Sequence, residues 1–430
     1  MRGWIGRLRA FYDEVAVRER WLVVGAMALT SALVLVYLAI RHPIPLLGDM
    51  PEYDRYGRFF VDGKWWWSTT PFGEAHPSAW KAPGYPLWIG FWYELLGASA
   101  VRVEIAQALF VAPLGVLFTW LLGRRLFTPA IGIAAAYVVA TIPLVWEWYG
   151  LLYPESLAIP VAMLTFYLFL ERTPTPALAA AVGAVSGVGL LIRPSSFFLL
   201  AGVAAAFVIG AGWRRGAALT AAAVAVAALV VLPWTVRNYI VLDGFIPISV
   251  QDGALSGTFN DEAANDPDYP YAWRAFLVDR QDVLEGPRVP DPELRQGLLE
   301  PGLDYISEHP FSVAEAFYWN GVVRFWDLRS PSGSVNESRG DGRARTVGKI
   351  GIALYYPLLA LAVVALWRQR RRTSLVVPLV AVALAASVVF TVGAVTRYRA
   401  PLEPMLAILA VSAVAGLSSR RTTETDLSHT

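Results

Sequence analysis

The chain has 430 residues, of which 56% are hydrophobic and 16% charged, and its mean hydropathy is +0.47. This composition excludes a soluble protein built on one large core and is typical of an integral membrane protein. A formal net charge of +2 gives no reason to expect nucleic-acid binding, and a sequence without Cys excludes disulfides and thiolate sites.

The first apolar run, Trp21–Ile40, contains no charged residue in twenty positions, enough for a helix to cross about 30 Å of hydrocarbon. Basic residues precede it: Arg2, Arg7, Arg9, Arg18 and Arg20. The positive-inside rule therefore predicts a cytoplasmic N-terminus. We interpret this run as a retained anchor and not as a signal peptide, because no small-residue cleavage site follows it directly.

Further apolar runs follow along the chain and bring the predicted number of spans to ten. They are Val103–Leu122, Ala130–Trp146, Ser156–Leu170, Ala177–Ile192, Ser195–Gly210, Ala217–Trp234, Val347–Leu366, Ser374–Val392 and Pro401–Leu417. An eleventh run, Gly84–Gly97, is short for a crossing and rich in aromatic residues. We interpret it as a re-entrant or interfacial helix, since the basic clusters of the later loops then stay in the cytoplasm.

These runs predict an all-α polytopic membrane protein with about 10–11 transmembrane helices, interfacial helices at its outer face and a small extracytoplasmic domain. The predicted segments are a cytoplasmic N-terminus (1–20), a first span (21–40), a first extracytoplasmic loop (41–102), a transmembrane bundle (103–234), an extracytoplasmic loop domain (235–346), C-terminal spans (347–417) and a cytoplasmic tail (418–430). The cytoplasmic loops are short and carry no P-loop or Rossmann fingerprint, which argues against a cytosolic nucleotide-binding domain.

Three carboxylates follow the first span in the stretch GDMPEYDRYGRFF: Asp49, Glu52 and Asp54. Asp49 is either a catalytic group or the N-cap of a helix that has Pro at an early position. For Glu52 and Asp54 the expected place is the solvated face of that helix, with Glu52 near Arg55 or Arg58 as an ion-pair partner.

Basic residues at the predicted outer membrane edge need an explanation, because orientation follows from basic residues staying inside. There are five of them: Lys81, Arg193, Arg237, Arg397 and Arg399. Each can snorkel to the interface or pair with a carboxylate such as Glu155 or Glu403. Five on one face indicate a phosphate site, since Arg offers a planar fork of donors and Lys a point charge. At a membrane edge that phosphate belongs to a lipid head group or a polyprenyl carrier.

Several motifs occur in a characteristic order: GD-x-x-x-Y with Asp49 and Tyr53, KAPGYP, GLLIRP, PWTVRNYIVLDGFIPIS, an EHPF-led helix ending RFW, and RYRAPLEP. In this order the chain resembles the GT-C superfamily of membrane glycosyltransferases, and more narrowly the glycosyltransferase family 39 and aminoarabinose-transferase-like group. The resemblance covers about Gly48 to Leu417. It implies transfer of a sugar from a polyprenyl phosphate carrier to a lipid, glycan or protein acceptor on the extracytoplasmic face of a bacterial plasma membrane.

The resemblance also implies roles for single residues. Asp49 matches the family's general base, Lys81 and Arg193 match its phosphate-binding positions, and Arg397 with Arg399 match the basic motif before the last span. The family often has Glu directly after this Asp, whereas here Met50 follows.

Further residues are supporting candidates: Glu52, Tyr53, His76, Glu155 and Arg237. Glu155 can cap its helix or orient an Arg of the phosphate site. A divalent metal ion is a candidate cofactor, with His76 joining Asp49 or Glu74, although no HExxH-like spacing supports it. The metal site therefore stays unknown.

Two functions remain open at this point. A glycosyltransferase needs a base and a phosphate site, and a single displacement would invert the anomeric centre. A transporter or flippase of lipid-linked sugars needs the same phosphate site but no base.

Overall fold

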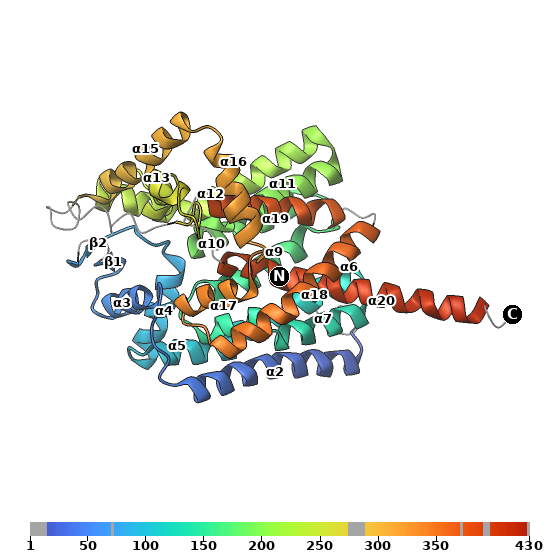
Figure 1. Cartoon of the computed structure of the whole chain (residues 1–430). Coiled ribbons are helices and arrows are strands. Elements are labelled where there is room, and N and C mark those ends of the chain that lie inside the picture. Colours follow the sequence, from blue (N-terminus) through green and yellow to red (C-terminus); the bar gives the residue numbers. More distant parts are fainter. Residues whose placement is uncertain (1–14, 70–72, 274–288, 370–372, 390–395, 428–430) are drawn as a thin grey trace.

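The computed structural model describes residues 15–69, 73–273, 289–369, 373–389 and 396–427, which form a helical bundle (Figure 1). Arg2, Arg7 and Arg9, which contribute to the predicted orientation, lie outside the described residues. So do residues 370–372, which belong to a basic loop, and the end of the predicted run Ser374–Val392.

The helices of ten or more residues are α2 (Val17–Arg41), α3 (Met50–Val61), α4 (Gly84–Leu96), α6 (Ala112–Leu126), α7 (Pro129–Thr141), α9 (Glu155–Phe169), α10 (Pro176–Ile192), α11 (Phe197–Ala211), α12 (Trp213–Leu242), α15 (Asp291–Glu308), α17 (Pro331–Gly340), α18 (Arg345–Arg368), α19 (Thr373–Val389) and α20 (Glu403–Leu427). Shorter elements are β1 (Trp67–Ser68), β2 (His76–Pro77), α5 (Ala100–Ala106), η1 (Gln107–Val111), α8 (Pro143–Trp146), η2 (Glu147–Gly150), η3 (Pro194–Ser196), η4 (Val250–Gly257), α13 (Asp261–Ala264), α16 (Ser312–Ala316), η6 (Phe317–Arg324) and η7 (Thr396–Leu402). The two strands pair antiparallel.

Six helical segments of the described chain are long and apolar enough to cross a membrane: 17–41, 100–126, 194–211, 213–242, 345–368 and 396–416. A bent pair, α7 with α8 and η2, would make a seventh. The remaining predicted runs form α9, α10 and α19, which are apolar but shorter. The polytopic all-α fold is confirmed, while fewer helices than the predicted ten meet the length of a full crossing.

The predicted span Ala130–Trp146 is not one straight helix, because the chain bends there by 66°. The bend follows from Pro143, whose ring disfavours helical backbone at the preceding residue. Ile142 is extended, with φ −76° and ψ 123°, so α7 ends at Thr141 and α8 begins at Pro143.

Two helices begin with the same local signal. Thr128 and Thr175 each accept a hydrogen bond from the backbone N–H three residues on, at 3.2 Å, and each is followed by Pro at the first helical position. A Thr cap satisfies a free N–H, and Pro there loses no helical bond. The sequence TP thus marks the start of α7 and of α10.

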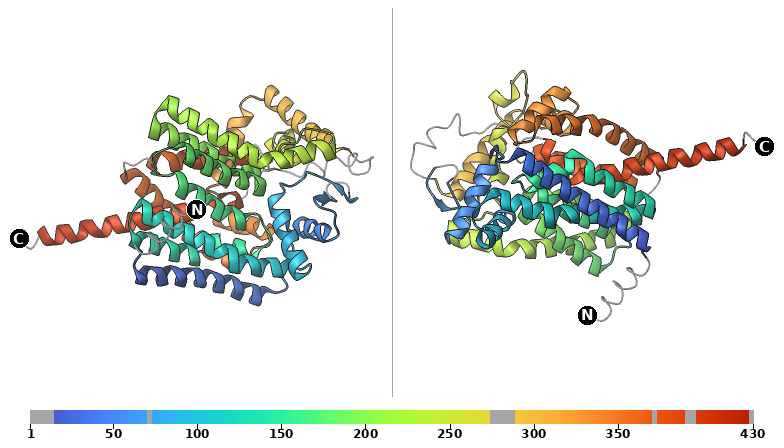
Figure 2. Two further views of the ribbon diagram at one scale, coloured as in Figure 1. Left: turned by 180° about the vertical axis from the view of Figure 1, so that it is seen from behind. Right: turned by 90° about the horizontal axis from the view of Figure 1, so that it is seen from below.

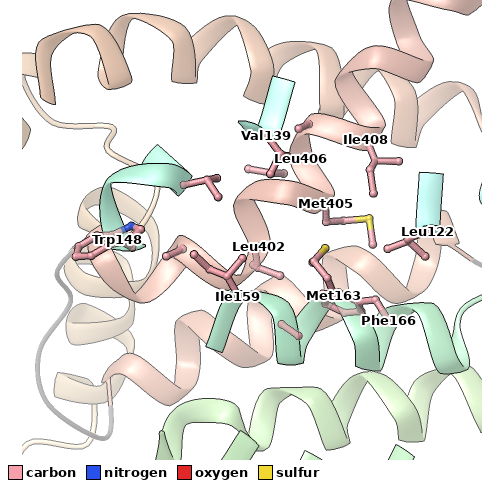
Figure 3. Packing of buried hydrophobic residues seen from close by; sticks show 14 of the residues in the cluster. Leu122, Val139, Trp148, Ile159, Met163, Phe166, Leu402, Met405, Leu406 and Ile408 are labelled. Carbon is pink, nitrogen blue, oxygen red and sulfur yellow. The ribbon is translucent and has the colours of Figure 1, made fainter. Parts of the chain in front are cut away.

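The buried core lies around the start of α20. Figure 3 shows Leu402, Met405, Leu406 and Ile408 meeting side chains of neighbouring helices, among them Ile159, Met163 and Phe166 of α9. The helix α20 therefore enters the centre of the bundle, and its first residues are fixed by packing on several sides.

The elements that do not span gather at one end of the bundle. Figures 1 and 2 show α3, the two strands, α13 and α15 at this end, whereas α20 projects from the opposite end. Here α4 approaches α10 closely: a Cβ at Gly84 would lie 2.8 Å from the carbonyl oxygen of Leu191. Only Gly fits this contact, which brings the segment before α4 next to the end of α10.

Candidate active site

Six segments that are distant in the sequence meet around one cavity of about 60 Å³ at the end of the bundle where the non-spanning elements lie. Its lining comprises Asp49, Tyr53, Lys81, Ala82, Tyr153, Pro154, Glu155, Ile192, Arg193, Pro194, Ser195, Ser249, Gln251, Arg397 and Tyr398. The cavity thus brings together Asp49 and three of the predicted phosphate-binding residues.

Asp49 stands at the N-cap position of α3, but its side chain makes no capping hydrogen bond. Its carboxylate instead lies between two cations: Oδ1 is 3.3 Å from Lys81 Nζ, and Oδ2 accepts a 2.6 Å hydrogen bond from Arg397 Nη2. About 31% of the Asp49 side chain is exposed, far more than the 6% of Lys81. Asp49 is therefore held by the cations and still open to a molecule in the cavity.

Gly48 sets the direction of Asp49. It has φ +61°, a region that side chains avoid, and a Cβ there would collide with Tyr153 Oη. That hydroxyl accepts from Asp49 N–H at 3.3 Å and donates to the carbonyl of Leu47 at 3.1 Å. The backbone before α3 is thus fixed against the segment that leads into α9.

Glu52 lies beside Lys81, and the expectation that it belongs to a solvated helix face is wrong. Glu52 Oε2 is 3.3 Å from Lys81 Nζ, and only 11% of the Glu52 side chain is exposed. The residues at i and i+3 of a helix start share one face. Lys81 therefore bridges Asp49 and Glu52, although the two are not adjacent in sequence.

Asp54 is also buried, again contrary to the expected solvated face. Its carboxylate accepts hydrogen bonds from Arg58 Nε at 2.8 Å and from the Tyr93 hydroxyl of α4. The physical reason is the packing of α3 against α4, which covers the side of α3 that carries Asp54. Arg58 pairs with Asp54, so it does not serve Glu52 as predicted.

Arg193 and Glu155 form a buried pair in the wall of the cavity. Arg193 Nη1 donates to Glu155 Oε1 at 2.7 Å, and the guanidinium lies 3.9 Å from the centre of the Tyr398 ring. Of the two roles predicted for Glu155, the orientation of an Arg is confirmed. Arg193 follows α10 directly, so the last turn of that helix sets its position.

Arg397 contacts three carboxylates. Besides Asp49, it donates from Nη1 to Asp341 Oδ1 at 3.2 Å, and its Nε is 3.7 Å from Glu155 Oε1. Its guanidinium also lies over the rings of Tyr153 and Tyr398, at 5.1 and 5.4 Å from their centres. Arg397 therefore connects the start of α3, the start of α9 and the end of α17.

Arg399 does not line the cavity, which corrects its predicted pairing with Arg397. Its side chain is 1% exposed and is bound by Glu403 at 2.5 Å, by Asp327 at 3.0 Å and by the carbonyl of Phe325. In the 3-10 helix η7, residues two apart point to different sides. Arg399 thus ties η7 to the segment after η6, away from any ligand in the cavity.

Arg237 and His76 lie outside the cavity lining as well. Arg237 donates to the carbonyls of Ser78 and Trp66, so it contacts the first loop and no carboxylate of the cavity. His76 Nδ1 faces the carbonyl of Glu74, and its Nε2 is 4.0 Å from Asp291 and not beside Asp49. Among the described residues no group of three or more His, Asp or Glu side chains is placed to hold a metal ion.

Several residues of the site were missed in the sequence. Tyr153 and Asp341 bind Asp49 or Arg397, and Tyr398 stacks on Arg193. Tyr153 precedes Glu155 by two positions, and Tyr398 stands between Arg397 and Arg399. Their position beside predicted site residues was a signal in the sequence that they also belong to the site. Ser249, the last residue of the motif ending FIPIS, and Gln251 just after it also line the cavity.

The charges of the site nearly balance. Lys81, Arg193 and Arg397 face the carboxylates of Asp49, Glu52, Glu155 and Asp341, as the ion pairs above show. Burial by itself raises the pKa of Asp49, but Lys81 and Arg397 outweigh it and hold that pKa below its ordinary value. The pKa of Lys81 is well above its usual range, because Asp49 and Glu52 outweigh the opposing effect of burial.

The pKa of Asp341 shifts in the opposite direction to that of Asp49. Burial is the largest influence and raises the pKa of Asp341 despite the nearby Arg397. The surroundings thus favour the ionised form of Asp49 and the protonated form of Asp341.

The fold is shared with solved membrane glycosyltransferases. The chain superposes on ArnT from Cupriavidus metallidurans bound to undecaprenyl phosphate with a TM-score of 0.54 and 16% identity, covering 91% of this chain and 60% of that one. It superposes on the Archaeoglobus fulgidus oligosaccharyltransferase tethered with an acceptor peptide with a TM-score of 0.54 and 15% identity, covering 94% and 50%. It also superposes on AglB from the same organism, in complex with an inhibitory peptide and a dolichol-phosphate. The TM-score is 0.53 and the identity 16%, and the match covers 95% of this chain and 52% of that one.

The chain is therefore a multi-pass membrane protein with the GT-C fold that the sequence predicted. Residues 76–236, which include Lys81, Glu155 and Arg193, match the family model of the dolichyl-phosphate-mannose-protein mannosyltransferases. The chain spans 50–60% of the length of these solved structures. A search of curated proteins found no match.

Proposed function

We propose that the chain is a glycosyltransferase that moves a sugar from a polyprenyl phosphate carrier to a lipid, glycan or protein acceptor. The observation that carries the proposal is the convergence of Lys81, Arg193 and Arg397 on one cavity that also exposes Asp49. The undecaprenyl phosphate of ArnT and the dolichol-phosphate of AglB support a carrier of this class.

The three cations would bind the phosphate of the donor. As the bond between the sugar and the phosphate oxygen breaks, its electron pair goes to that oxygen, and the negative charge on the phosphate grows. Lys and Arg side chains fixed beside this charge stabilise the transition state more than the ground state. Because Glu155 and Asp341 hold the two arginines, little reorganisation is needed during the reaction.

Asp49 would be the general base. The acceptor hydroxyl gives its proton to the Asp49 carboxylate while its oxygen forms the new bond to the anomeric carbon. With acceptor and phosphate on opposite sides of the sugar, one displacement inverts that carbon. General-base assistance of this kind is worth about 10²–10⁴-fold in rate.

The pH dependence of the reaction follows from the ion pairs of Asp49. In the free enzyme Lys81 and Arg397 keep the pKa of Asp49 low, so we expect kcat/KM to stay level down to about pH 4. A bound phosphate adds negative charge and draws on the same cations, which raises the pKa of Asp49. The acidic loss of kcat should then begin at least one pH unit higher than that of kcat/KM. Initial rates at varied donor concentration between pH 4 and 8 test this, and coincident acidic limbs would contradict it.

We further propose that the cavity faces the outside of the plasma membrane and that the N-terminus is cytoplasmic, with segments 41–102 and 235–346 extracytoplasmic. The basic residues support this orientation. Arg124, in the last turn of α6, pairs with Glu19, in the first turn of α2, at 3.1 Å. Asp49 follows the opposite end of α2, so these charges and the cavity belong to different ends of that helix.

Because the chain has no Cys, single introduced cysteines can report this orientation without background. Lys64→Cys in the first loop should react with a membrane-impermeant maleimide on intact cells. Arg214→Cys at the start of α12 should react only after permeabilisation. The reverse pattern would place the cavity in the cytoplasm.

The direct test of the function is cleavage of the donor. Purified protein is incubated with synthetic polyprenyl phosphate sugars and membrane extract as the source of acceptor, and free polyprenyl phosphate is measured by mass spectrometry. A glycosyltransferase releases it with acceptor present. A flippase of lipid-linked sugars moves the same donor across vesicles but leaves it intact.

A further inference from the structure

A second cavity lies between α17 and α18, the adjacent helices seen near the centre of Figure 1. Its volume is about 460 Å³, and its lining comprises Pro331, Ser332, Val335, Asn336, Arg345, Lys349, Ile352, Ala353 and Tyr356. None of these residues lines the candidate active site. The second cavity is therefore a separate feature of the fold.

Two cations stand at the start of α18 and line this cavity. Arg345 and Lys349 are four residues apart, so they share one face of the helix, and both are exposed. Within the described part of the chain neither has an ion-pair partner, whereas the neighbouring Arg343 is paired with Glu147 at 2.8 Å. Like charges at this spacing repel each other, and an anion placed between them would relieve the repulsion.

The rest of the cavity is largely apolar. Val335 and Ile352 are buried in its wall, and Tyr356 donates its hydroxyl hydrogen to the carbonyl of Asp327, which leaves the ring to face the cavity. The next residues of α18 continue as a membrane-crossing helix with exposed apolar side chains, among them Ile350 and Leu354. Cations at the edge of an apolar span, above an apolar hollow, match a molecule with an anionic head and a hydrocarbon tail.

We propose that this cavity binds a phospholipid with an anionic head group. Arg345 would contact the lipid phosphate through its fork of donors, and Lys349 would contact it as a point charge. The upper part of an acyl chain would lie against Ile352 and Tyr356. Simple snorkelling of the two side chains would need no cavity. The site is independent of the sugar-transfer reaction proposed above.

The location gives such a lipid a structural role. The lining residues Val335 and Asn336 belong to α17, and α17 ends next to Asp341, which binds Arg397 of the candidate active site. A lipid seated between α17 and α18 would brace α17 against the bundle.

Native mass spectrometry of the full-length protein in detergent tests the proposal, with phosphatidylglycerol and phosphatidylcholine as probes. Each cation near a lipid surface contributes about a fivefold preference for an anionic head group, so two predict about 30-fold tighter retention of phosphatidylglycerol. The double variant Arg345→Gln/Lys349→Gln should lose that preference. Arg214→Gln/Arg215→Gln, which removes two exposed charges at the start of α12, should keep it.

Three outcomes would overturn the proposal. Equal retention of phosphatidylglycerol by the wild type and the Arg345/Lys349 variant would show that the cavity is not the site. An equal loss in both double variants would indicate a general effect of charge. Displacement of the lipid by millimolar inorganic phosphate would show a site for free anions. An unchanged thermal midpoint of each variant confirms that it is folded, and none of these results bears on sugar transfer.

Discussion

Replacing Asp49 by Asn should reduce sugar transfer by at least 10²-fold while the protein still binds its donor. Asn has nearly the same shape and can still accept a hydrogen bond from Arg397, so the cavity keeps its form. It cannot take the proton of the acceptor hydroxyl, and the rate loss is that of general-base assistance. Loss of the Asp49 charge also leaves Lys81 and Arg397 more attractive to a phosphate, so donor affinity should be equal or higher.

Two measurements separate the effect on the rate of transfer from the effect on donor affinity. Transfer is followed by release of polyprenyl phosphate, and donor binding by isothermal titration with the intact donor. Asp62→Asn is the matched control, since Asp62 stands at the other end of α3 and is exposed. If Asp49→Asn kept more than a tenth of the wild-type rate, Asp49 would not be the base. Full lipid-linked sugar transport with no cleavage in either protein would favour a flippase.

Replacing Lys81 by Met should weaken donor binding and destabilise the protein at the same time. Met keeps the length of the apolar stem but leaves Asp49 and Glu52 without the cation that lies 3.3 Å from each. Charge-assisted hydrogen bonds contribute about 1.5–3 kcal/mol each, which corresponds to about 10- to 100-fold weaker binding of the donor. Removing one partner of a buried ion pair destabilises by about 3–5 kcal/mol, so the thermal midpoint should fall clearly.

A second substitution separates the effect of Lys81 on donor binding from its effect on stability. In Lys81→Met/Glu52→Gln the unpaired buried carboxylate is gone, and we expect part of the thermal stability to return. Donor binding should not return, because no cation has been restored. Recovery of both would mean that Lys81 is only structural. Lys64→Met in the same loop, where Lys64 is exposed, serves as the control for removing a Lys.

The sequence predicted the membrane class and most helices because hydropathy is a local property of the chain. It also predicted five cations on one face, since a basic residue at an outer membrane edge contradicts the usual orientation. Of these, Lys81, Arg193 and Arg397 line the cavity, whereas Arg237 and Arg399 do not. The break at Ile142 was missed although Pro143 signals it. Local hydropathy does not show where a helix bends.

Glu155 and Glu403 were among the predicted partners of the cations, and they pair with Arg193 and Arg399. The other partners could not be predicted, because they depend on contacts between distant segments. Asp341 contacts Arg397 from the end of α17, and Glu52 contacts Lys81 because α3 places it on the same face as Asp49. Arg399 was placed wrongly because two arginines separated by one residue were treated as a unit, whereas η7 directs Arg399 to Asp327 and Glu403. A single sequence carries no signal for the pairings with Asp341 and Asp327.

The near balance of charge around the cavity has a consequence for selectivity. Each cation is held by a carboxylate of the chain itself, so any phosphate that enters must first compete with these internal anions. That competition is the same for a small soluble phosphate and for a polyprenyl phosphate. Only the lipid is concentrated beside the cavity, because its hydrocarbon chain keeps it in the membrane, and this local concentration offsets the competition. The internal carboxylates would thereby exclude the abundant free phosphate of the aqueous phase and reserve the cations for a carrier that arrives from the membrane.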